Sequence, residues 1–184
     1  THRYSSAASD VYKRQCYTQG SDLLKRDFIF SGIGWILTTS SVLSATKSRE
    51  VTEIVVKKSK RKLYLFSGNE VIKSYKVDLG FAPKGHKNFE GDGKTPEGAY
   101  KIDRKNANSK YHLSVGISYP NQKDQQFAKL KGKLPGGDIF IHGTDKPFRW
   151  FQKDWTAGCI AVSNKEIREI YNLVKIGTPI FIEP

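Results

Sequence analysis

Two residues that could perform acyl transfer stand seventeen positions apart in this chain, at His142 and Cys159. Cys159 follows a glycine in the run Trp155-Thr156-Ala157-Gly158-Cys159, and the chain's other cysteine is Cys16, near the N-terminus. A lone cysteine is either a small buried hydrophobic residue or a free thiol kept for its reactivity. A histidine able to remove the thiol proton favours the second interpretation, which predicts a thiol of lowered pKa that alkylates rapidly near neutral pH.

His142 ends a short apolar run that follows Gly136-Gly137 and precedes Gly143, a pattern typical of a buried strand bounded by turns. The alternative is a polar residue whose hydrogen bonds are satisfied at the edge of the core. As a base, the neutral imidazole would take the thiol proton and later protonate a leaving amine. No Asp or Asn stands out as the group that orients the ring, so a backbone carbonyl such as that of Gly143 is the candidate.

The residues around the cysteine are candidates for contacts with an oxyanion or a substrate. Gly158 permits a close backbone approach that a side chain would block, and amides near it could receive a developing oxyanion. The candidates for these contacts are Gly158, Ala157, Trp155 and Arg149. No close ligand pairing is found among His86, His112, His142 and Cys159, so the sequence predicts no metal and no other cofactor.

Three motifs, in this order, resemble the L,D-transpeptidase catalytic domain, the YkuD-like cysteine enzymes that remodel bacterial peptidoglycan. They are Gly91-Asp92-Gly93-Lys94-Thr95-Pro96-Glu97-Gly98-Ala99-Tyr100, Ile141-His142-Gly143-Thr144 and Thr156-Ala157-Gly158-Cys159-Ile160. The resemblance covers residues 51–184 and implies that Cys159 is the nucleophile and His142 the proton donor and acceptor. Ala157 and Ala161 stand where the family usually has a histidine and an arginine, which places the chain in a subgroup with Ala-Gly-Cys. Arg149, Lys153 or Trp155 could compensate for the missing groups.

The resemblance also implies a reaction. Cys159 would form a thioester with the third residue of a peptidoglycan stem tetrapeptide, release D-alanine, and transfer the acyl group to an amine acceptor to crosslink the wall. With water as the acceptor, the same site would be an L,D-carboxypeptidase or an amidase. A noncatalytic wall-binding module is a further alternative. The expected partners are therefore peptidoglycan stem peptides.

The N-terminal part of the chain differs in character from the rest. Residues 1–20 look like a non-native or artefactual stretch, and residues 21–45 like a secretory signal peptide or an N-terminal anchor. In the latter, Lys25-Arg26 precede the mostly apolar residues 28–43, and Ser44-Ala45-Thr46 follow. That apolar run is shorter than the roughly twenty residues of a membrane-spanning helix, which favours cleavage; an uncleaved anchor with transient membrane association is the alternative. We therefore expect an exported protein of the periplasm or cell envelope.

The remaining chain is strongly basic. From Thr46 onward it has 26 lysines and arginines against 15 acidic residues, a net charge of +11. Such a surface indicates anionic partners, although a solvated lysine-rich face is the simpler alternative. Because export argues against nucleic acid, the predicted partners are anionic polymers of the cell envelope.

The hydrophobic pattern predicts a mostly β domain, a sheet or barrel-like sandwich of the YkuD type. Strands are expected at residues 51–58, 62–66, 71–79, 99–102, 111–119, 139–142 and 178–182. A short helical insert is expected at residues 122–130. One C-terminal helix should begin at Ser163, with Glu166 completing a capping box, and end at Gly177. Its apolar face should comprise Ile167, Ile170, Tyr171 and Val174. Residues 51–184 are thus predicted to form one catalytic domain.

Overall fold

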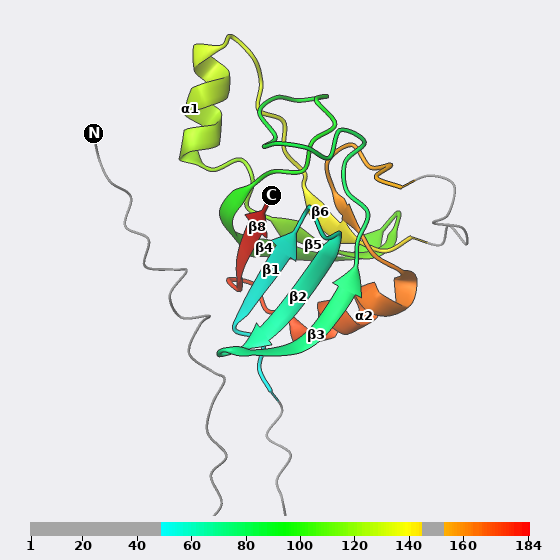
Figure 1. Cartoon of the computed structure of the whole chain (residues 1–184). Helices are drawn as coiled ribbons and strands as arrows, with labels where there is room; N and C mark the ends of the chain where they lie inside the picture. Colours follow the sequence, from blue (N-terminus) through cyan, green and yellow to red (C-terminus); the bar gives the residue numbers. More distant parts are fainter. Residues whose placement is uncertain (1–48, 145–152) are drawn as a thin grey trace, which may run out of the picture. The chain divides into compact units, whose positions relative to one another are not determined.

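The computed structural model contains an eight-stranded sheet with two helices (Figure 1). The chain divides into two units, Thr1–Ser44 and Ala45–Pro184, and the structure describes residues 49–144 and 153–184. The predictions for residues 1–20 and 21–45 lie outside the described residues. Within the described ranges, no helix has the length and apolar character needed to cross a membrane.

The order of strands across the sheet is β3-β2-β1-β8-β4-β5-β6-β7. Their bounds are β1 Glu53–Lys57, β2 Lys62–Ser67, β3 Glu70–Lys76, β4 Gly98–Ser109, β5 His112–Ile117, β6 Phe140–His142, β7 Ile160–Ala161 and β8 Pro179–Glu183. The final strand, β8, lies between β1 and β4, parallel to the first and antiparallel to the second. It therefore joins the N-terminal three strands to the four that lead to His142 and Cys159.

Alternating side chains give the sheet its buried face. In β8, Ile180 and Ile182 are buried while Phe181 and Glu183 are exposed, the period of two expected for a strand with one covered face. Ile54 and Val56 of β1 are fully buried in the same core. The predicted mostly β fold with a C-terminal helix and a short helical insert is confirmed.

Both helices begin at a capping box. In α1, Gln122–Leu130, the Asn121 side chain accepts from the helix amides and Asp124 bonds back to the cap. In α2, Asn164–Leu173, Ser163 and Glu166 form the box that the sequence predicted. The α2 helix ends at Leu173 and not at Gly177. After it, the Lys175 amide donates to the Thr178 hydroxyl at 3.2 Å and the chain enters β8.

The observed strands differ from the expected ones at their ends, most of all at the C-terminal ends of β4 and β3. Strand β4 runs to Ser109 rather than ending near residue 102, because it pairs with β8 in its first part and with β5 in its second. Strand β3 ends at Lys76 rather than residue 79. Beyond it the chain leaves β2, and Asp78 pairs instead with Ala161 of β7. This crossing brings residues 78–80 beside the cysteine-bearing segment.

Candidate active site

His142 and Cys159 are brought together by the parallel pairing of β6 and β7. Ile141 lies opposite Ile160, and His142 lies opposite Ala161. Ile141 and Ile160 are fully buried in the core. Because side chains alternate along a strand, His142 lies on the opposite face from Ile141. Cys159 directly precedes β7, and continuing the same alternation back to it would direct its side chain to the face of His142.

The imidazole of His142 is buried, with 3% of the residue exposed. Its Nδ1 lies 2.7 Å from the Gly143 carbonyl oxygen. A carbonyl oxygen can only accept, so Nδ1 carries a proton and donates it, the contact that the sequence analysis expected. Burial lowers the pKa of His142, although the Gly143 carbonyl opposes the shift. The ring is therefore neutral near pH 7, with Nε2 as its basic atom.

Two aromatic side chains cover the His142 ring. Tyr111, in the turn between β4 and β5, stacks on it with the ring centroids 4.4 Å apart. Trp155 meets it edge-on at 5.9 Å. Trp155 was among the candidates from the sequence, but Tyr111 was not. Nothing in its local pattern marks Tyr111, because its position depends on β5 pairing with β6.

The Cys159 thiol is half-buried, and its Sγ lies 3.5 Å from the carbonyl oxygen of Asp138. Burial raises the pKa of Cys159, and the carboxylate of Asp138 acts in the same direction. The Phe140 backbone amide and the cation of Lys87 oppose the shift. The resting thiol is thus protonated near pH 7, in contrast to the lowered pKa expected from the sequence, because desolvation outweighs the nearby donors.

The backbone before Cys159 forms a tight turn around Thr156. The Thr156 hydroxyl accepts from the Gly158 amide at 3.1 Å and donates to the Cys159 carbonyl at 2.7 Å. Gly158 has φ of +134°, and a Cβ there would lie 2.7 Å from the Lys94 carbonyl oxygen. Glycine is therefore required both by conformation and by the close approach of the Gly91 to Tyr100 motif.

That motif is itself held by Asp92. One carboxylate oxygen accepts from the buried Lys87 ammonium at 2.9 Å and from the Lys94 amide at 3.0 Å. The other accepts from the amides of Asn88 and Phe89 at 2.8 and 3.0 Å. These bonds lower the pKa of Asp92 even though burial alone would raise it. The motif thus forms a rigid loop against Gly158, with the Lys87 cation near the thiol.

A bidentate ion pair fixes the segment that leads to the cysteine. The carboxylate of Asp154 accepts from Arg61 Nε at 2.9 and 3.0 Å and from its terminal nitrogen at 2.7 Å. Asp154 also accepts from the Leu79 amide at 3.0 Å. Arg61 belongs to the turn between β1 and β2, so this pair connects the far half of the sheet to the Cys159 turn. Nothing in the local sequence around Arg61 or Asp154 indicates this pair.

The buried Lys58 performs a similar function at the end of β1. With 2% of its side chain exposed, it donates to the Gly85 and Thr95 carbonyl oxygens at 2.7 and 2.9 Å and to Glu97 at 2.8 Å. Burial lowers the pKa of Lys58, while Glu97 opposes the shift. All three donors are used, which identifies Lys58 as a structural connector between β1 and the Gly91 to Tyr100 motif.

Comparison with known proteins identifies the family. The family model of the L,D-transpeptidase catalytic domain, YkuD, matches residues 51–182. The chain belongs to this family. YafK of Escherichia coli, whose name marks it as an L,D-transpeptidase, is 30% identical over 126 residues, covering 66% of this chain and 45% of YafK.

Solved structures agree with this assignment. Pgp2, the helical cell shape determining protein of Campylobacter jejuni, is 27% identical with a TM-score of 0.56, covering 72% of this chain and 47% of Pgp2. Bd1075 of Bdellovibrio bacteriovorus is 29% identical with a TM-score of 0.54, covering 75% of this chain and 49% of Bd1075. The chain spans about half the length of these relatives.

The remaining candidate residues of this L,D-transpeptidase domain occupy different environments. Ala157 is exposed beside Gly158, and Lys153 is exposed upstream of it. Ala161 is fully buried opposite His142, so an arginine there would require the neighbouring strands to repack. Arg149 lies outside the described residues. Of the three groups proposed to compensate for the two alanines, only Trp155 is seen beside the imidazole.

Proposed function

We propose that the chain is a peptidoglycan L,D-transpeptidase with Cys159 as nucleophile and His142 as proton donor and acceptor. The observation that supports the proposal is the parallel pairing of β6 with β7, the strand that Cys159 directly precedes, together with the bond from His142 Nδ1 to the Gly143 carbonyl. That bond fixes the tautomer and leaves Nε2 as the basic atom. The proposed site of action is the periplasm or cell envelope, with residues 21–45 directing export.

Acylation would begin from two neutral groups. His142 Nε2 takes the thiol proton as Sγ attacks the carbonyl carbon of the third residue in a stem tetrapeptide. The carbonyl oxygen becomes an oxyanion. The Gly158 amide is already bonded to Thr156, so we assign oxyanion stabilisation to the neighbouring Cys159 amide, with Gly158 shaping the turn. The imidazolium then protonates the departing amine as the peptide bond breaks, which releases D-alanine and leaves a thioester.

Transfer reverses these roles. A side-chain amine of a neighbouring stem attacks the thioester carbonyl and gives its proton to His142. The bond to sulfur breaks, the thiolate recovers the proton, and the product is a crosslink between two third-position diamino acids. The basic surface would hold the domain near carboxylates and phosphates of the envelope polymers.

Hydrolysis by the same residues is the second candidate. The observation that favours it is the presence of two alanines where the family usually has larger side chains. Ala157 is exposed, and Ala161 is buried. Without the imidazole and the guanidinium, fewer groups would hold an acceptor stem, and water could take its place. The protein would then be an L,D-carboxypeptidase or an amidase.

The test is to incubate the protein from Thr46 onward with a purified disaccharide tetrapeptide and follow the products by mass spectrometry. A dimer that has lost one D-alanine supports the transpeptidase, whereas a tripeptide alone supports the hydrolase. Cys159→Ala should abolish either product, and His142→Ala should reduce the rate by about 10²-fold or more, the usual contribution of a positioned base. Turnover that survives Cys159→Ala would reject the proposal, and no turnover by the intact protein would favour a wall-binding module.

A further inference from the structure

Helix α1 and the turn that follows it stand away from the sheet (Figure 1). Only Asp124 and Ala128 of the helix are buried. The Asp124 carboxylate accepts from Tyr100 at 3.0 Å and from the Asn121 amide at 2.9 Å, and it lies 3.1 Å from His86 Nε2. The helix is therefore fastened by polar contacts in its first turn, and its outer surface is open to solvent.

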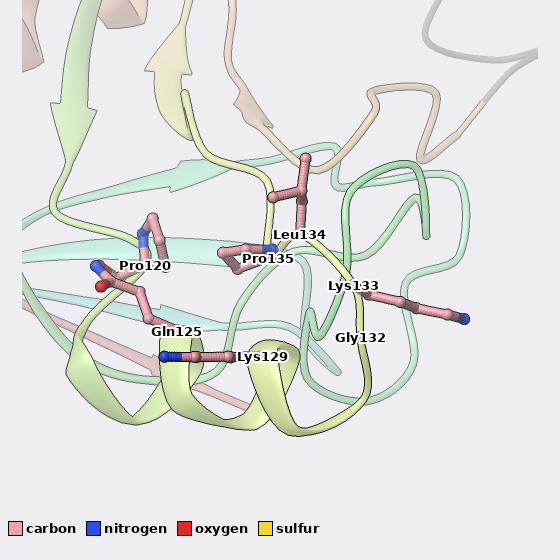
Figure 2. A pocket seen from close by; sticks show the side chains of 7 residues that line it. All are labelled: Pro120, Gln125, Lys129, Gly132, Lys133, Leu134 and Pro135. Carbon is pink, nitrogen blue, oxygen red and sulfur yellow. The ribbon is translucent and has the colours of Figure 1, made fainter.

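The helix and the turn that follows it carry large exposed apolar side chains. Leu130 is 84% exposed, Leu134 is 70% exposed and Phe127 is 43% exposed. Leu134 also lines a hollow of about 530 Å³, together with Pro120, Pro135, Gln125 and Lys129. Figure 2 shows the Leu134 side chain directed away from the helix at the edge of this hollow. Apolar groups gathered at such a surface usually mark an interaction site.

The helix and the turn that follows it are also basic. Lys123, Lys129, Lys131 and Lys133 are all exposed. Within residues 49–144 and 153–184, none of them forms an ion pair with a carboxylate, and Lys133 lies over the Phe89 ring at 4.6 Å. The exposed acid beside them is Glu90, whose amide bonds the Leu134 carbonyl. An anionic partner is therefore complementary to this surface.

We propose that the α1 face, defined by Leu130, Leu134 and the four lysines, binds an anionic phospholipid surface. Leu130, at the end of the helix, and Leu134, in the turn after it, can enter the acyl boundary while the nearby lysines extend to the headgroup phosphates. A wall polymer rich in carboxylates or phosphates would use the lysines but would have no use for the leucines. This inference concerns a surface distinct from Cys159 and is measured without turnover, so its failure would leave the proposed function untouched.

The test uses residues 46–184, since all described helices and strands lie in the compact unit Ala45–Pro184 and the apolar residues 28–43 would bind lipid by themselves. Cosedimentation is measured with vesicles of phosphatidylcholine mixed with phosphatidylglycerol and with phosphatidylcholine alone. We expect binding to the anionic vesicles that falls at least tenfold in Leu130→Ser with Leu134→Ser, and at least tenfold in Lys129→Gln with Lys131→Gln and Lys133→Gln.

Matched controls separate this face from general basicity. Ile176→Ser removes an exposed apolar side chain elsewhere, and Lys60→Gln with Lys101→Gln and Lys165→Gln removes the same charge elsewhere. Both controls should bind within twofold of the unaltered protein, with all variants melting at the same temperature. Equal losses in controls and α1 variants would overturn the proposal, as would equal binding to neutral vesicles. Binding to purified cell wall that depends on the same α1 residues, without binding to vesicles, would also overturn it.

Discussion

The side chains of Cys159 and His142, the two residues proposed to react, are both kept uncharged by burial. Burial raises the pKa of the thiol and lowers the pKa of the imidazole. A resting thiolate and imidazolium pair is therefore disfavoured, and the proton should move only when a substrate carbonyl is in place. This arrangement limits reaction of the free enzyme with unrelated electrophiles.

Alkylation of Cys159 should consequently require alkaline pH. In the protein from residue 46 onward, Cys159 is the sole cysteine. We expect the rate of reaction with iodoacetamide to rise with pH and to reach half its maximum above the usual thiol value of about 8.5. The measurement is a stopped-time alkylation series followed by mass spectrometry, with Cys159→Ala as the blank. A plateau already reached below about pH 6.5 would instead indicate a preformed ion pair.

The stacking of Tyr111 on His142 leads to a prediction about the pKa of the imidazole. Tyr111→Ala should let water reach the imidazole, so the pKa of His142 should rise toward its usual value of about 6.5. The measurement is an NMR titration of the imidazole protons. Tyr111→Phe keeps the stacked ring and should leave the pKa lowered; equal pKa values in all three proteins would show that Tyr111 does not shield the ring.

Among the structural elements, the segment before Cys159 depends on contacts with the opposite part of the sheet. Asp154→Ala would remove the bidentate bond to Arg61 and the bond to the Leu79 amide. We expect the free energy of unfolding to fall by about 2 kcal/mol, the scale of hydrogen bonds to a charged group, and turnover to fall with it. Urea unfolding gives the first quantity and product formation the second.

The exposed pair between Arg49 and Glu70 is the matched control, since both side chains are 61% exposed. Glu70→Ala should cost less than about 1 kcal/mol, as surface ion pairs do. If Asp154→Ala costs no more than this control and leaves turnover intact, the ion pair does not position the cysteine.

The elements that could be predicted from sequence are those whose signals are local. Asn121 with Asp124 and Ser163 with Glu166 are capping residues separated by three positions, and both helices begin where such spacing indicates. The Gly143 carbonyl was identified because it is adjacent to His142. The contacts of Asp154 and Tyr111 could not be predicted in this way, because Arg61 and His142 lie far from them in sequence and meet them only through strand pairing.

For the whole molecule, stability depends on the interior strand β8. Ile180 is fully buried and pairs with both Ile54 and Tyr100, whereas Phe181 beside it is 40% exposed. Ile180→Ala should lower the free energy of unfolding by about 3 kcal/mol, a typical cost of deleting buried methyl groups. Phe181→Ala, the neighbouring control on the other face, should cost less. The free energies of unfolding of both variants are measured in urea. A larger loss of stability in Phe181→Ala than in Ile180→Ala would mean that the outer face of β8 is the better packed one.

The interior position of β8 also determines when, during synthesis, the sheet can be completed. A ribosome synthesises β8 after the other seven strands, yet in the strand order of the sheet β8 is the strand that lies between β3-β2-β1 and β4-β5-β6-β7. Until that point, β1 and β4 each present an unpaired backbone edge, the kind of surface that invites aggregation or capture by a chaperone. A nascent domain without its final strand therefore keeps both of these edges unpaired until synthesis is almost finished.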